Sequence, residues 1–69
     1  MNNQNAQLAL KGNWLELKGN VTKKWGKLTD NDVAQINGNS EILAGKLMQN
    51  YAMSKEDAEK EIERFCKKS

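Results

Sequence analysis

Trp25-Gly26-Lys27-Leu28-Thr29 marks the corner around which the rest of the chain is arranged. Before it, apolar side chains recur every three or four positions, which is the spacing of one face of a helix. Gly26 fits the left-handed position that ends a helix, and Thr29 fits the N-cap of a following helix with Asp32 three residues on. The stretch therefore predicts two helices joined at a corner, with Leu28 directed into the core.

The helix before the corner is predicted to run from Asn13 to about Trp25. Asn13 is its expected N-cap, and Glu16 would complete a capping box with it. Gly19 lies roughly opposite the apolar stripe, where it is either a tolerated surface glycine or a point of close backbone approach. The stripe itself consists of Trp14, Leu17, Val21, Trp25 and Leu28.

The second half of the chain resembles the first. A short helix is predicted over about residues 30–37, ended by Gly38, and the pattern then recurs at an offset of 26 residues. Gly12, Asn13, Leu17, Gly19, Val21 and Trp25 correspond to Gly38, Asn39, Leu43, Gly45, Leu47 and Tyr51. The repeat predicts a third helix over about residues 40–51 and a fourth, capped by Ser54, that ends near Lys67.

These patterns predict an all-α fold, a small bundle of four helices built as two similar helix pairs. Residues 1–11 show no periodicity, and we expect them to form a flexible leader in which Leu8 and Leu10 can add a short helical turn. Residues 12–69 are expected to form a single helical domain with a small core, because a chain of 69 residues hides only about 60% of its unfolded surface. The predicted core consists of Trp14, Leu17, Val21, Trp25, Leu28, Val33, Ile36, Leu43, Leu47, Tyr51, Ala58, Ile62 and Phe65.

Composition and charge limit the class of protein. A single cysteine excludes an intramolecular disulfide, and no window approaches the roughly 20 apolar residues of a membrane-spanning helix. With no recognisable signal peptide, we expect a soluble, cytoplasmic protein. The net charge is +2, but residues 1–28 carry five Lys and one Glu, so the first helix is the basic element.

The motifs resemble those of the CsbD-like family of small bacterial proteins over about residues 12–65. The residues that carry the resemblance are Asn13-Trp14, Leu17-Lys18-Gly19, Trp25-Gly26-Lys27-Leu28-Thr29-Asp30, Leu43-Ala44-Gly45-Lys46-Leu47 and residues 54–61. The resemblance implies a bundle of about four helices and a cytoplasmic protein made under stress, since some members belong to general stress regulons. It implies no established activity, cofactor or catalytic residue.

The residues themselves offer little catalytic chemistry. The chain has no histidine, so it lacks the usual general base, and Cys66 alone cannot form a tetrahedral zinc site. The acidic residues between 56 and 63 alternate with basic ones, as is typical of a solvated helix face. We therefore expect that the protein is not an enzyme and that it binds no cofactor, metal or small-molecule substrate.

The functional hypothesis is a non-enzymatic general stress-response protein of uncharacterised molecular activity, acting as a small interaction or protective module with a protein partner. The alternative is a weak nucleic-acid or anionic-membrane-surface binder that uses the basic first helix through Lys18, Lys23, Lys24 and Lys27. A solvated face that complements the helix dipole explains the same lysines. A protectant that is only partly folded when dilute is a further competitor.

Overall fold

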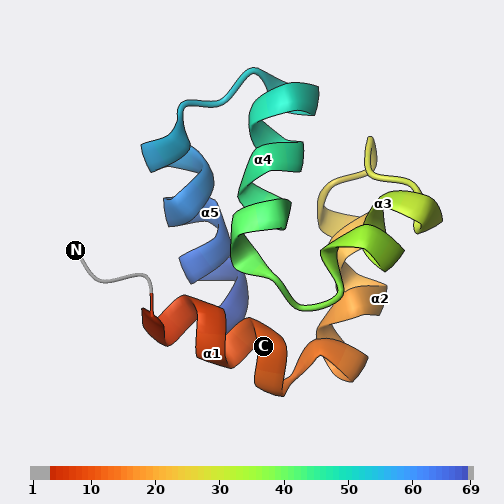
Figure 1. Cartoon of the computed structure of the whole chain (residues 1–69), viewed down its shortest axis with the longest axis vertical. Coiled ribbons are helices and arrows are strands. Elements are labelled where there is room, and N and C mark those ends of the chain that lie inside the picture. The colour runs from red at the N-terminus through yellow and green to blue at the C-terminus, as the bar shows by residue number, and fades with distance from the viewer. Residues whose placement is uncertain (1–3, 69) are drawn as a thin grey trace.

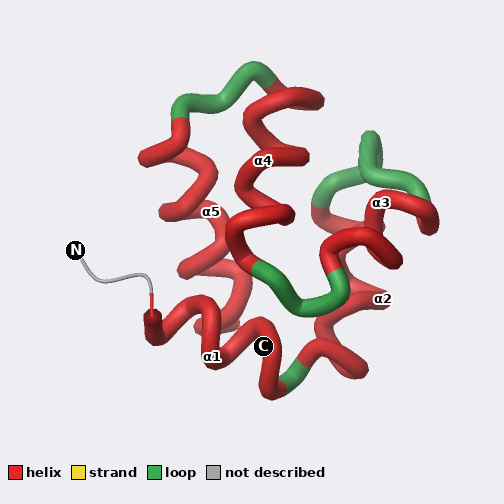
Figure 2. Tube along the Cα trace, viewed as in Figure 1, coloured by secondary structure: helices red, strands yellow, loops and turns green. Residues whose placement is uncertain are grey.

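The computed structural model describes residues 4–68, with side chains described from residue 7 to residue 67, and this part of the chain is helical with short connections (Figures 1 and 2). No strand occurs within it. The helices are α1 (Gln4–Gly12), α2 (Trp14–Lys24), α3 (Asp30–Ile36), α4 (Ser40–Tyr51) and α5 (Lys55–Lys68). The all-α prediction is confirmed, with five helices in the described residues in place of the four expected.

The helices α4 and α5 form an antiparallel hairpin, and the corner formed by α2 and α3 packs beside it. The helices α4 and α5 run side by side in opposite directions, and α1 crosses one end of that pair and contacts both (Figure 1). The helices α2 and α3 form the predicted corner, and α3 packs on α4. This arrangement directs one side of every helix towards a common core.

That core is the one predicted, with two additions. Ten of the thirteen predicted residues are buried, and the other three, Trp14, Val33 and Tyr51, are half-buried and pack against them. Leu10 and Ala44 are also buried. The buried residues are Leu10, Leu17, Val21, Trp25, Leu28, Ile36, Leu43, Ala44, Leu47, Ala58, Ile62 and Phe65.

The helix α1 is longer than the short helical turn expected around Leu8 and Leu10. Residues 4–11 were expected to belong to a flexible leader, but in the structure they are helical, and Leu10 lies fully inside the core. The side chain of Gln7 fixes α1 to the start of α4, because its Oε1 accepts hydrogen bonds from the backbone N–H (2.7 Å) and hydroxyl (2.6 Å) of Ser40. Residues 1–3 of the predicted leader lie outside the described residues.

Asn13 does not cap α2 as predicted. Its side-chain oxygen makes no capping bond, and its Nδ2 instead donates to the carbonyl of Ala9 at 3.2 Å. The backbone N–H of Asn13 also donates to Ala9, and its carbonyl accepts from Leu17. Asn13 is thus a one-residue joint that ends α1 and begins α2 at once.

The conformation of the corner was predicted only in part. The capping box is confirmed, since the N–H of Asp32 donates to Thr29 Oγ1 (3.2 Å) and the N–H of Thr29 donates to Asp32 Oδ2 (3.0 Å). Gly26 is not left-handed. The C-cap of α2 is Trp25, with φ −118° and ψ 82°, and a short turn follows, in which Leu28 N–H donates to the Trp25 carbonyl. Glycine is therefore not required at Gly26 by a positive φ.

The glycine that the fold does require is Gly38. Its φ is +82°, and a Cβ added there would lie 3.2 Å from Lys11 Cα and 3.5 Å from Trp14 Cβ. The joint between α1 and α2 therefore packs directly on the connection between α3 and α4. At Gly19, by contrast, a Cβ would meet nothing within 4 Å, so of the two interpretations the surface glycine is correct.

The two predicted halves meet at their corners. The backbone N–H of Lys27, in the first corner, donates to the Tyr51 hydroxyl at 3.1 Å. Ser54 caps α5 as predicted, through a bond from the N–H of Asp57 (3.1 Å). The halves still differ in detail, since α4 ends with a left-handed Ala52 (φ 53°), whereas α2 ends without any left-handed residue.

Candidate functional site

The four lysines predicted to contact an anionic partner differ in their surroundings. Lys18 and Lys23 are exposed on α2, and neither forms an ion pair within the described residues. Lys24 points towards α5, where its Nζ lies 3.8 Å from Glu61 Oε1. It also lies 5.6 Å from the centroid of the Trp25 ring, so its charge is partly engaged inside the molecule.

Lys27 connects the corner between α2 and α3 to the end of α4. Its Nζ donates to the Asn50 carbonyl at 3.3 Å and lies 5.1 Å from the centroid of the Tyr51 ring, at the exit of α4. Cations are favoured beside the carbonyls at a helix C-terminus. The described contacts of Lys27 are thus those of a structural tie between the two halves.

Helical spacing directs the three predicted lysines of α2 to different sides of the helix. At about 100° per residue, Lys18 and Lys23 project about 140° apart on α2, and Lys24 projects a further 100° round. Lys27 lies beyond the end of the helix. The structure therefore leaves Lys18 and Lys23 as separate exposed charges, and their contact with an anionic partner stays a prediction.

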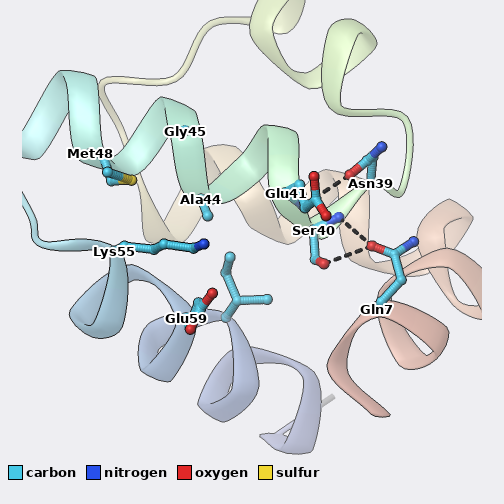
Figure 3. Close-up of a pocket in the computed structure, with 10 residues that line it drawn as sticks. Gln7, Asn39, Ser40, Glu41, Ala44, Gly45, Met48, Lys55 and Glu59 are labelled. Carbon is cyan, nitrogen blue, oxygen red and sulfur yellow. Dashed lines mark hydrogen bonds between the residues drawn. The ribbon is translucent and has the colours of Figure 1, made fainter. Parts of the chain in front are cut away.

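A groove that was not predicted from the sequence lies between α4, α5 and α1, with a volume of about 570 Å³. The floor is mainly apolar, and the rim is polar and carries charges of both signs (Figure 3). Floor residues are Ala44, Gly45, Met48 and Ile62, and rim residues are Gln7, Asn39, Ser40, Glu41, Lys55 and Glu59. We call this feature the α4 groove.

Gly45, which has no side chain, is one of the residues that line the α4 groove. A Cβ at this position would meet nothing within 4 Å, so no neighbouring group fills the space. Gly45 and Met48 also line a second, shallower hollow on the other side of α4. Together with Ile42, they give α4 an outward apolar strip, in which Ile42 and Met48 are each 39% exposed.

The polar end of the α4 groove is occupied by helix capping. Gln7 accepts the two bonds from Ser40, as the dashed lines of Figure 3 show, and Asn39 Oδ1 accepts from the N–H groups of Glu41 (2.9 Å) and Ile42 (3.3 Å). The hydroxyl of Ser40 is therefore bound to Gln7. These polar atoms hold the start of α4.

Two titratable groups outside the groove have perturbed pKa values, and both perturbations have structural causes. The backbone hydrogen bond from Thr29, and then the Lys46 side chain 3.1 Å away, lower the pKa of Asp32. Burial raises the pKa of the Cys66 thiol. A raised pKa reduces the thiolate fraction that reacts with electrophiles and metals.

Two further features are absent from the part of the chain that the structure describes. No group of three or more His, Cys, Asp or Glu residues is placed to hold a metal ion. None of the helices described has both the length and the apolar character needed to cross a membrane.

Known proteins similar to this chain share one family. The family model described as CsbD-like matches residues 9–60. The UPF0337 protein pc0632 of Protochlamydia amoebophila is 54% identical over 56 residues, 81% of this chain and 85% of the relative. The UPF0337 protein YjbJ of Escherichia coli K12 is 47% identical over 51 residues, 74% of each chain. No solved structure matches significantly.

Proposed function

Because this chain belongs to the CsbD-like family, we propose that it is a non-enzymatic general stress-response protein that works as a small interaction or protective module. Family membership supports the stress-response part of the proposal, as some members belong to general stress regulons. The same resemblance supports a cytoplasmic location. The structure supports the interaction part through one feature, the α4 groove.

The α4 groove suits an apolar side chain from a protein partner. Its floor combines Ala44 and Ile62 with the flexible thioether of Met48, and a methionine side chain can adapt to the shape of a partner. Its rim carries Glu41 and Glu59 together with Lys55, which can pair with charges of either sign. A peptide or helix that presents one or two apolar side chains flanked by charges would complement this surface.

The same surroundings support a non-enzymatic reading. The polar groups at the end of the groove, Gln7, Ser40 and Asn39, already bind one another or the backbone of α4. Glu41 and Lys55 are exposed at the rim. General acid–base catalysis depends on burial or neighbours that shift pKa values towards neutrality, and exposed side chains lack that environment.

The test is partner capture with a blocked groove. Gly45→Gln places a side chain over the groove floor, where a Cβ meets nothing, so the fold should be kept while the groove is obstructed. Gly19→Gln is the matched control, because Gly19 is equally unobstructed but lies on α2. Both substitutions replace a glycine inside a helix, which should stabilise that helix by roughly 0.5–1 kcal/mol.

In stressed cells treated with a crosslinker, we expect one stoichiometric protein partner to be captured by the wild type and by Gly19→Gln, and lost with Gly45→Gln. If Gly45→Gln captures the same partner to the same extent, the groove is not the interaction site. Turnover of a metabolite by the purified protein would overturn the non-enzymatic reading.

The alternative function, a weak nucleic-acid or anionic-membrane-surface binder, has a specific observation in its favour. Lys18 and Lys23 are exposed and form no ion pair within the described residues. If all four predicted lysines engaged phosphates, the logarithm of the affinity would fall with a slope of about −3 to −4 against the logarithm of the salt concentration. A smaller slope is expected here, since Lys24 and Lys27 have partners inside the molecule.

A further inference from the structure

A five-residue motif occurs twice, seven residues apart, at the start of the chain. The two copies are Leu8-Ala9-Leu10-Lys11-Gly12 and Leu15-Glu16-Leu17-Lys18-Gly19, which differ at one position. In each copy the second leucine is buried and the first is exposed. Leu10 and Leu17 are 0% and 1% exposed, whereas Leu8 and Leu15 are 67% and 82% exposed, the highest values among the large apolar residues described.

Helix geometry accounts for this division. Residues two apart on a helix project about 200° from one another, so a leucine that enters the core places its partner on the opposite side. Lys11 follows Leu8 by three residues and Gly12 by four, which returns both to the same outward side. Lys18 and Gly19 stand in the same relation to Leu15, and all four of these residues are exposed.

Leu8 projects from α1 and Leu15 from α2 on the side away from the core, and Lys11 and Lys18 flank them. Figure 1 shows α1 and α2 meeting at an angle, with α4 and α5 on its inner side. Each of the two helices thus carries one exposed leucine, followed by an exposed lysine and a glycine. A Cβ at either glycine would meet nothing within 4 Å, so the surface is open there. We call this set, Leu8, Lys11, Leu15 and Lys18, the outer corner face.

We propose that the outer corner face docks on an anionic lipid surface. Exposed leucines bring a favourable transfer free energy when they enter the boundary between headgroups and acyl chains, and lysines beside them attract anionic headgroups. Lys11 and Lys18 form no ion pair within the described residues, so both charges are available for that contact. The face is separate from the α4 groove and shares only Lys18 with the lysines considered above.

Charge and polarity favour lipid over two other occupants. In a two-fold contact between two copies of the chain, Lys11 and Lys18 of one copy would lie close to the same lysines of the other copy, and these like charges would repel. Glu16 is the one acidic residue among residues 1–28, so little negative charge is available nearby to offset that repulsion. A nucleic acid would engage the lysines through its phosphates but would leave Leu8 and Leu15 in water. An anionic bilayer satisfies the leucines and the lysines together.

The test is cosedimentation of the full chain with vesicles. One set of vesicles contains equal parts of phosphatidylglycerol and phosphatidylcholine, and the other contains phosphatidylcholine alone, both at 50 mM salt. Wild type should sediment with the anionic vesicles and much less with the neutral ones. The variant Leu8→Gln/Leu15→Gln should bind the anionic vesicles at least about tenfold more weakly, as should Lys11→Gln/Lys18→Gln.

The matched control is Ile42→Gln/Met48→Gln, which removes two exposed apolar side chains from α4. It should bind vesicles as wild type does. Since all the changed side chains are exposed, each variant should keep the wild-type thermal midpoint within a few degrees, which circular dichroism checks.

Several outcomes would overturn the proposal. One is undetectable binding of wild type to the anionic vesicles. Another is a loss of vesicle binding in Ile42→Gln/Met48→Gln as large as that in the leucine or lysine variants. Unchanged vesicle binding by Leu8→Gln/Leu15→Gln would mean that charge alone acts. Tighter binding to duplex DNA at the same salt would favour nucleic acid. A wild-type dimer in sedimentation equilibrium that the leucine substitutions dissociate would assign the face to self-association.

Discussion

The indole ring of Trp25 lies 5.0 Å from the phenyl ring of Phe65, centroid to centroid, with the ring planes inclined at 52°. The tilted arrangement is one that aromatic pairs prefer. The pair joins the end of α2 to the last turns of α5, and Lys24 pairs with Glu61 beside it. Both rings are buried, so the contact closes the bundle between segments far apart in the chain.

Replacing the phenyl ring should therefore destabilise the whole fold. We expect Phe65→Ala to lower the free energy of unfolding by about 3–5 kcal/mol, as is typical for a buried aromatic residue. Urea unfolding followed by tryptophan fluorescence measures this, and the wild-type transition should be cooperative, unlike that of a partly folded protectant. Leu15→Ala is the control and should change stability by no more than about 0.5 kcal/mol. A loss below about 1 kcal/mol for Phe65→Ala would contradict the packing described.

A second prediction concerns α1. Leu10→Ala should destabilise the protein by about 2–5 kcal/mol, because it empties a fully buried site between α1, α4 and α5. Leu8→Ala, two residues away on the exposed side, should change stability by no more than about 0.5 kcal/mol. Thermal melts of the two variants measure the difference. If both melt like wild type, residues 4–11 behave as the leader that the sequence suggested.

Two glycines should respond in opposite directions to the same substitution. Gly38→Ala should destabilise by at least about 1–2 kcal/mol, because it forces a side chain into a left-handed conformation and against Lys11 Cα. Gly19→Ala should stabilise by about 0.5–1 kcal/mol, since it lies within α2 with open space around it. Chemical denaturation of both variants measures the two signs. The close approach at Gly38 is disproved if its alanine variant is as stable as wild type.

The fourth prediction is a dependence of stability on pH. The folded state lowers the pKa of Asp32 below its ordinary value of 3.8, so the stabilisation from this carboxylate is present above that value. It is lost as the pH falls through the lower pKa of the folded state, because protonation then breaks the bonds to Thr29 and Lys46. Thermal midpoints between pH 6 and pH 2.5 should therefore fall less steeply for Asp32→Asn than for wild type.

The adjacent carboxylate provides the control for this measurement. Asp30 is exposed in the first turn of α3 and makes none of the hydrogen bonds that hold Asp32. Asp30→Asn should keep most of the wild-type pH dependence. Identical slopes for wild type and Asp32→Asn would show that the capping box does not bind the ionised form preferentially.

The sequence predicted the elements whose signals are local. The capping residues Thr29 and Ser54 each bond to a backbone N–H three residues on, and the apolar positions of α2, α4 and α5 follow helical spacing. By contrast, among the α1 side chains that the structure describes, Leu10 alone belongs to the buried core, and isolated helices of this length are marginal in water. The bonds that hold α1 join Gln7 to residues more than 30 positions away, which no local pattern reveals.

The predictions at Asn13 and Gly26 were wrong for two different reasons. Asparagine can bond to either of two neighbouring helices, and its residue type does not say which, so the absence of a predicted α1 assigned Asn13 to α2. Gly26 was read as left-handed from its position, although the turn needs no positive φ there. The α4 groove was missed because its lining comes from α1, α4 and α5, and no local pattern in the sequence reveals how these helices pack. The spacing of Gly45 between Ile42 and Met48 was the available signal.

The joint at Asn13 fixes the number of residues between Leu10 and Leu17. Seven residues make about two helical turns, so both leucines enter the core only while a single residue separates α1 from α2. One inserted residue would rotate α1 by about 100° and turn Leu10 out towards solvent. The connection between α4 and α5 is longer, with three residues between the helices, of which Ser54 caps α5. An inserted residue should therefore destabilise the fold more at Asn13 than directly before the Ser54 cap.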